Sequence, residues 1–176
     1  MRYSEIMEAS QRLPTREIGP TLYHGTGCLN AADILQHKLI HASDDPHDYG
    51  VSMTDELSSA EYFAARTDAE SWAFILHQKN TPDKEYYEDK SGAMDIHRHL
   101  TGVIFEFNTA KIAEHYRIKP IAYTGDWEDE AEWRVLNESI PLMPFLQGIH
   151  VKAEVVEWWM QNMPEKADSL HALLRY

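Results

Sequence analysis

The chain has one cysteine, no long apolar run and few basic side chains. Cys28, the single cysteine, permits no disulfide bond within the chain, which is typical of proteins of a reducing compartment. No apolar run approaches the roughly 18 residues that a membrane-spanning helix needs, and the first residues lack the apolar stretch of a signal peptide. These absences predict a cytoplasmic protein without a membrane partner.

Acidic residues outnumber basic residues in this chain. The chain carries 29 acidic against 16 basic side chains, a formal charge of -13. Such a surface repels a phosphate backbone, so non-specific binding of nucleic acids is not expected. A nucleic acid remains conceivable as a substrate, provided that the few cations converge around one cleft.

The composition predicts one domain. At 176 residues and 43% hydrophobic content, the chain can bury a sizeable core, and no linker rich in Pro, Gly or Ser divides it. We expect the core over residues 21–151, preceded by a helix over 4–13 and followed by helices over 153–175.

Many short strands separated by short helices predict an α+β domain with mainly antiparallel pairing. In the strand over 50–54, alternation assigns Val51 and Met53 to the buried face. Ser58 and Glu61 have the spacing of a capping box at the start of a helix, and Asn30 is a candidate N-cap. The expected strands cover 21–26, 39–41, 50–54, 102–107, 118–123, 131–136, 140–143 and 146–151, and the expected internal helices cover 31–38, 58–66, 69–79 and 110–115.

Three motifs contain residues of the types that bind ligands or catalyse reactions. The first is Tyr23-His24-Gly25-Thr26, where an extended strand would present a histidine at its edge with glycine backbone exposed beside it. A His-Gly pair alone more often marks a strand that runs into a turn. The second motif is the strand over 50–54 with the helix that carries Tyr62.

The third motif is Glu130-Ala131-Glu132-Trp133-Arg134. Alternation along a strand places the charged residues on one face, toward a cleft, and Ala131 and Trp133 on the other, toward the core. By itself this pattern is more often a solvated strand face with an ion pair between Glu132 and Arg134.

In this order, the three motifs resemble those of the ADP-ribosyltransferase superfamily, with the nearest likeness to the diphtheria toxin catalytic domain and the poly(ADP-ribose) polymerases. The resemblance covers about residues 21–151. It implies a split antiparallel β-sandwich with flanking helices, in which NAD lies in the cleft between two small sheets. It also implies NAD as a substrate.

The resemblance assigns roles to individual residues. His24 matches the histidine that holds a ribose hydroxyl, the backbone at Gly25 matches the clamp on the nicotinamide amide, and Thr26 completes this cofactor-binding motif. Tyr62 matches a tyrosine that stacks on the nicotinamide ring. Glu132 matches the catalytic carboxylate, which stabilises the positive charge that builds on the ribose as nicotinamide departs. Opposite charges about 4 Å apart attract by roughly 4 kcal/mol at an effective dielectric of 20.

Two residues resemble a different branch of the superfamily. Ser52 stands where the toxin and polymerase branch has a tyrosine, and it resembles the serine that braces the catalytic glutamate in arginine-modifying enzymes. Glu130, two residues before Glu132, matches the glutamate that engages the acceptor in those enzymes. The acceptor therefore stays open between protein arginine, other protein side chains and nucleic acid.

The expected function is NAD-dependent transfer of ADP-ribose to a macromolecular acceptor. A toxin of a toxin and antitoxin pair, or a phage protein that modifies a host target, would fit such an enzyme. NAD hydrolysis without transfer is one alternative. A domain of the same fold that binds NAD or a partner without turnover is the other.

Metal and thiol chemistry are less favoured. The chain has ten histidines, but neither a Cys-x-x-Cys nor a His-Glu-x-x-His spacing occurs, so no metal site is expected. Cys28 is better explained as a small packed residue than as a nucleophile paired with His24. The histidines considered as ligands are His37, His41, His47, His97 and His99.

Overall fold

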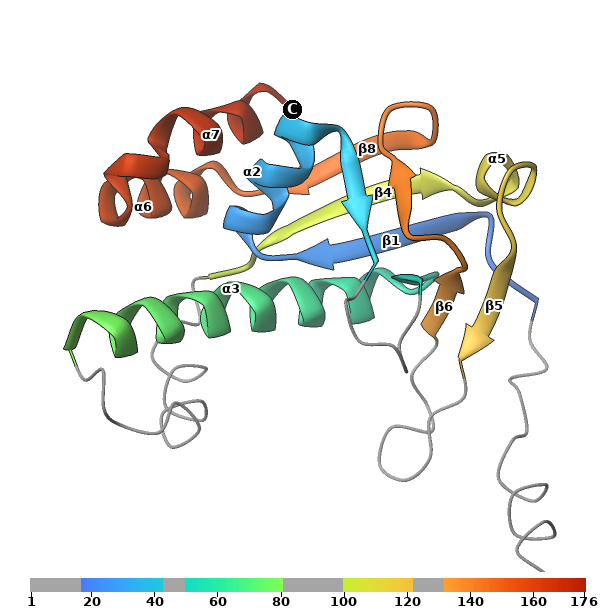
Figure 1. Cartoon of the computed structure of the whole chain (residues 1–176), viewed down its shortest axis with the longest axis horizontal. Coiled ribbons are helices and arrows are strands. Elements are labelled where there is room, and N and C mark those ends of the chain that lie inside the picture. Colours follow the sequence, from blue (N-terminus) through green and yellow to red (C-terminus); the bar gives the residue numbers. More distant parts are fainter. Residues whose placement is uncertain (1–16, 43–49, 81–99, 122–131) are drawn as a thin grey trace, which may run out of the picture.

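Six strands form one antiparallel sheet in the order β5-β6-β3-β1-β4-β8 (Figure 1). The computed structural model describes residues 17–42, 50–80, 100–121 and 132–176, with only the backbone described over 77–80. A second sheet pairs β2 with β7. The strands are β1 (Thr21–Thr26), β2 (Leu39–His41), β3 (Val51–Thr54), β4 (Val103–Asn108), β5 (Ile118–Ile121), β6 (Glu132–Val135), β7 (Ser139–Pro141) and β8 (Leu146–Val151).

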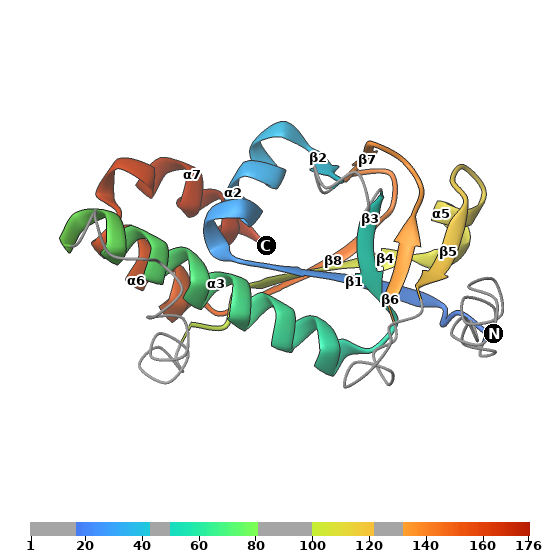
Figure 2. The ribbon, with the colours of Figure 1, turned by 60° about the horizontal axis from the view of Figure 1, so that its bottom comes forward.

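Helices cover both faces of the large sheet. The long helix α3 runs along one face, and α2, α6 and α7 lie on the other side (Figures 1 and 2). The helices are α2 (Cys28–His37), α3 (Leu57–Asn80), α5 (Thr109–Ala113), α6 (Ala153–Asn162) and α7 (Ala167–His171), with 3-10 turns at Pro164–Lys166 and Ala172–Arg175. The protein is therefore an α+β domain with an antiparallel sheet, as the sequence predicts.

The large sheet is divided between β1 and β3. Strand β1 pairs with β4 from Thr21 to Thr26, but it pairs with β3 only at Tyr23 opposite Thr54. The other edge of β3 pairs with β6, and β6 pairs in turn with β5. The sheet thus consists of two three-stranded halves, β5-β6-β3 and β1-β4-β8, that are joined at a single residue pair.

Most strands agree with the sequence predictions, and the helices agree less well. Strand β8 has the predicted bounds, and Val51 and Met53 are buried as predicted. Residues 58–66 and 69–79 are helical as predicted, but the predicted division into two helices is wrong, because α3 is one continuous helix. The predicted helix over 4–13 lies outside the described residues.

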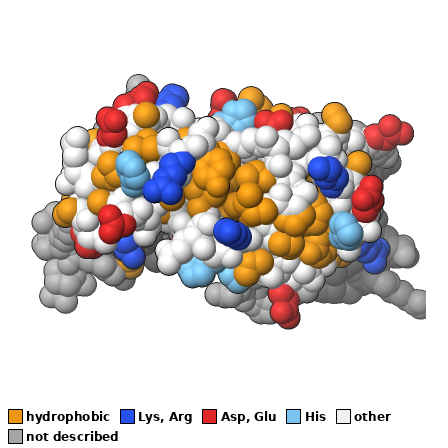
Figure 3. Space-filling model, turned by 90° about the horizontal axis from the view of Figure 1, so that it is seen from above, with side chains coloured by type: hydrophobic (Ala, Val, Ile, Leu, Met, Phe, Trp, Pro, Cys, Tyr) orange, Lys and Arg blue, Asp and Glu red, His pale blue; other side chains and the backbone are white. Residues whose placement is uncertain are grey.

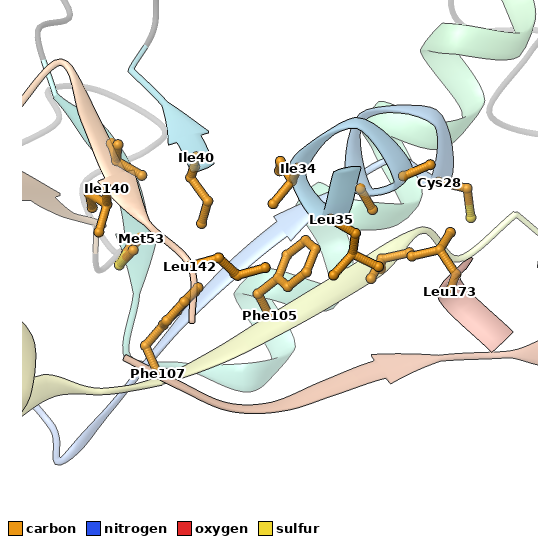
Figure 4. Close-up of a cluster of buried hydrophobic side chains, with 14 of the residues drawn as sticks. Cys28, Ile34, Leu35, Ile40, Met53, Phe105, Phe107, Ile140, Leu142 and Leu173 are labelled. Atoms are coloured by element: carbon orange, nitrogen blue, oxygen red, sulfur yellow. The ribbon is translucent and has the colours of Figure 1, made fainter. Parts of the chain in front are cut away.

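The core lies between the large sheet and the layer that contains α2, α7 and the small sheet (Figure 4). Alternation along β1 and β4 directs Leu22, Phe105 and Phe107 into this core, and all three are fully buried. The opposite pleats of the same strands face α3, where Ile104 packs against Ala60 and Ala64.

Outside this core, the face of the molecule that carries α2 and α7 is mixed in character. Seen from above, its described part carries interspersed acidic and basic side chains, with apolar groups gathered near the middle (Figure 3). The described part of this face therefore offers no continuous basic surface to a nucleic acid.

A buried carboxylate joins three elements. Asp68, on α3, is fully buried and accepts hydrogen bonds from the backbone N–H of Cys28 at 2.8 Å and of Gly102 at 3.2 Å. Cys28 opens α2, so this carboxylate caps a helix from a distant part of the chain. Asn30 is therefore not the N-cap that the sequence suggests, since α2 begins before it.

The Asp68 contacts predict a large loss of stability in the Asp68→Ala variant. The substitution leaves two buried N–H groups unpaired, at about 1 to 3 kcal/mol each. We expect a decrease of about 3 kcal/mol in the free energy of unfolding, measured by urea denaturation. Asp33→Ala, at an exposed position of α2, is the control and should change it by less than about 0.5 kcal/mol. Equal stabilities of the two variants would contradict the capping role.

Helix α3 lies so close to β1 that Gly25 has no room for a side chain. A Cβ atom added there would stand 2.1 Å from the carbonyl oxygen of Ala60 and 3.1 Å from the backbone nitrogen of Ala64. Both neighbours are backbone atoms of the helix, so the overlap can be relieved only by displacing α3 from the sheet. The glycine of the His-Gly motif is thus required by packing.

Gly25→Ala should therefore lower the free energy of unfolding by about 3 kcal/mol, as overpacking in a tight core does. Gly148→Ala is the matched control in the same sheet, because its added Cβ would meet only a carboxylate oxygen of Glu106 at 3.7 Å. This control should stay within about 0.5 kcal/mol of the wild type in urea denaturation. Wild-type stability of Gly25→Ala would refute the close approach.

Candidate active site

The imidazole of His24 spans the division of the large sheet. Its Nδ1 atom lies 2.9 Å from the backbone carbonyl oxygen of Ser52, on β3. Continuing the register from the Tyr23 and Thr54 pair would place Gly25 opposite Ser52, but no backbone pair forms there. A side-chain hydrogen bond thus crosses the gap where the backbone ladder between β1 and β3 has ended.

This contact determines which nitrogen of His24 carries the proton. A carbonyl oxygen can only accept, so Nδ1 must be the donor. The surrounding protein desolvates the ring and lowers the pKa of His24 below 6.5, while the hydrogen bond to Ser52 opposes this shift to a smaller extent. The ring is therefore neutral at pH 7, and its Nε2 atom is left with a lone pair that can accept a hydrogen bond.

Glu132 lies at the same level of the sheet as the His24 motif. It pairs with Thr54 on β3, and Thr54 pairs with Tyr23 on β1. Two strand spacings separate the backbone of Glu132 from that of Tyr23, which amounts to about 10 Å. The structure therefore brings the backbones of the first and third motifs close together across β3, and among the described residues no hydrogen bond joins the two side chains.

Glu132 forms an ion pair with Arg134 along the same face of β6. The Nε and Nη2 atoms of Arg134 lie 2.9 and 2.6 Å from Oε1 of Glu132. The two side chains are only 5% and 11% exposed, so the pair is enclosed rather than solvated. On the other face of β6, Trp133 and Val135 are buried, as the alternation predicts.

Trp133 anchors β6 to the segment between β3 and α3. Its indole N–H donates to Oδ1 of Asp55 at 3.0 Å, and Oδ2 of Asp55 accepts from the backbone N–H of Gly19 at 2.9 Å. The strand that carries Glu132 is thus fixed on both faces: by the Asp55 contact on one and by the Arg134 pair on the other.

Tyr62 lies apart from this pair, on the rim of a hollow. Its side chain is 46% exposed and makes an edge contact with Phe63, at 5.5 Å between ring centroids. The hollow, of about 720 Å³, lies between α3 and the strands β4 and β8. Its other principal lining residues are Glu61, Ile104, His150 and Lys152. His24, Ser52 and Glu132 do not line it, so this hollow does not gather the predicted site residues, and Thr26 is buried beside it in the sheet.

Cys28 is unsuited to nucleophilic chemistry. Burial raises the pKa of the Cys28 thiol far above its usual range, and the neighbouring Asp68 carboxylate raises it further. Burial also raises the pKa of Asp68, although its hydrogen bonds from Cys28 and Gly102 partly oppose this shift. These two groups are structural, in agreement with the interpretation of Cys28 as a packed residue.

Several predicted residues lie outside the described part of the chain. They are Glu130, His47, His97 and His99. Among the described residues, no three His, Cys, Asp or Glu side chains gather as ligands for a metal ion. No helix in this part of the chain is both long and apolar enough to cross a membrane.

Comparisons with protein-family models, with characterised proteins and with solved structures find no match to this chain.

The role of Asp68 was not predicted from the sequence. Ala60, Ala64 and Asp68 follow one another at intervals of four along α3, and all three are fully buried. A carboxylate that continues a stripe of small buried residues was a readable signal of a buried acceptor. The Asp68 carboxylate holds the start of α2, four residues after His24, in place.

The lowered pKa of His24 predicts a pH dependence of stability. The unfolded chain takes up a proton near pH 6.5, whereas the folded protein resists protonation. Stability should therefore be full above pH 6.5 and decrease as the pH falls from 6.5 toward the lowered value. His24→Gln, which does not titrate, should show a smaller decrease in thermal unfolding scans than the wild type.

His171→Gln, at an exposed position, is the control and should keep the wild-type pH dependence. If His24→Gln and the wild type lose stability in parallel on acidification, His24 is not held neutral in the fold.

Proposed function

We propose that the protein is an NAD-dependent ADP-ribosyltransferase, which cleaves the bond between nicotinamide and ribose and transfers ADP-ribose to a macromolecule. The observation that carries this proposal is the His24 bridge across the divided sheet. It leaves a neutral imidazole with an accepting Nε2 at the junction of the two halves, and the backbone of Glu132 lies across β3 from the backbone of Tyr23, next to His24 in the chain. The division of the sheet into two small halves agrees with the split sandwich that the sequence motifs suggest.

In this proposal, His24 binds and Glu132 catalyses. A ribose hydroxyl donates to Nε2 of His24, while the carboxylate of Glu132 lies near the carbon that loses nicotinamide. The positive charge that develops on the sugar is then stabilised by a preorganised negative charge, which needs no rearrangement during the reaction. The Gly25 backbone would hold the nicotinamide amide, and Ser52 holds His24 through its carbonyl oxygen. Tyr62, on the rim of the separate hollow, takes no part in this arrangement.

The acceptor is a separate proposal. Glu130 favours a protein arginine, because by resemblance it matches the glutamate that engages the acceptor in arginine-modifying enzymes, and a carboxylate attracts a guanidinium. A formal charge of -13 also favours a cationic acceptor over a polyanion. Mass spectrometry of proteins and nucleic acids from cells that express the chain, with a search for the ADP-ribose mass, would identify the acceptor and any host target or antitoxin.

A binding domain without turnover is the second candidate. It is favoured by the Arg134 guanidinium, which lies 2.6 Å from Glu132 and offsets part of its charge. A time course of nicotinamide release with and without cell extract separates the candidates. No release indicates a binding domain, release without labelled macromolecule indicates an NAD glycohydrolase, and release with labelling indicates a transferase.

Glu132→Gln should reduce nicotinamide release by about a thousandfold, the rate equivalent of roughly 4 kcal/mol. NAD affinity, measured by calorimetry, should change little, because the charge acts mainly in the transition state. The amide retains an oxygen that can accept from Arg134, and thermal unfolding checks the fold. Glu138→Gln, at an exposed position just beyond β6, is the control and should keep wild-type release. Full turnover by Glu132→Gln would refute the assignment.

A further inference from the structure

The geometry of the Glu132 and Arg134 pair is unusual in its asymmetry. Two donors of one guanidinium, Nε and Nη2, converge on a single oxygen, Oε1. Among the described residues, the second carboxylate oxygen, Oε2, accepts no hydrogen bond. One oxygen is therefore held by two charge-assisted hydrogen bonds while the other is left for a further partner.

The arginine is itself held in place. It is buried on β6, between Ser52 on β3 and Lys119 on β5 in the ladder. Its Cδ atom lies 3.3 Å from the position that a Cβ of Gly50 would take, and Gly50 has a φ of +117° that favours glycine. The missing side chain at Gly50 thus leaves room for the aliphatic stem of Arg134, and the burial of this residue restricts the movement of its guanidinium.

From this geometry we propose that Arg134 is a positioning residue, which fixes the Glu132 carboxylate so that Oε2 faces the ribose of bound NAD. The proposal rests on the proposed function. Arginine suits this role better than lysine because its planar fork gives two bonds of fixed direction to one oxygen, whereas an ammonium group gives a single movable one. Arg134 does not touch the substrate.

Arg134→Lys tests the proposal because it keeps the charge and loses the fork. We expect kcat for nicotinamide release to fall by about 10- to 100-fold, as small misplacements of a catalytic group do, with KM for NAD little changed. Lys119→Met removes a cation from the exposed neighbouring position on β5 and should keep wild-type kcat. The thermal unfolding temperature of each variant is measured as a check that the variant is folded.

A double-mutant cycle keeps the test decisive if a variant is destabilised. In the Glu132→Gln background, Arg134→Lys should cause no further fall in kcat, since the residue acts only through that carboxylate. A structural role would instead reduce kcat equally in both backgrounds. Wild-type kcat in Arg134→Lys, or an effect on KM alone, would overturn the positioning role. Absence of nicotinamide release by the wild type would overturn the proposed function, and the positioning role with it.

Discussion

The hydrogen bond from His24 to the Ser52 carbonyl is the interaction on which the arrangement of the site depends. Backbone pairing joins the two halves of the large sheet at only Tyr23 and Thr54, so the imidazole supplies a second connection across the division. The same contact fixes the tautomer of the ring. A bond that connects the two halves therefore also leaves Nε2 as an acceptor at their junction.

Packing on each side holds the two halves in position. Helix α3 lies against the backbone of Gly25, and the Asp68 carboxylate holds the start of α2 and the loop before β4. On the other half, the Trp133 indole binds Asp55. The polar groups in these contacts are paired, so the backbones of His24 and Glu132 have little freedom to move relative to their own halves.

Local sequence patterns were enough to predict most strands, because the alternating residues Val51 and Met53 on β3, and Trp133 and Val135 on β6, are buried on one face of the sheet. They were not enough for the helices. The start of α2 depends on Asp68, 40 residues away, and no local cap signals it. No local pattern indicated that residues 58–79 belong to one helix, as they do in α3.

The site was predictable only in part, since the sequence suggested His24 and Glu132 by resemblance but not the row of strand pairs that relates them. The burial of the Glu132 and Arg134 ion pair could not be predicted from the local sequence either, because it depends on neighbouring strands. The most direct measurement is a crystal structure with a non-hydrolysable NAD analogue. We predict that His24 Nε2 and a Glu132 carboxylate oxygen both contact the ribose next to nicotinamide. An analogue bound away from both residues would contradict the proposed site.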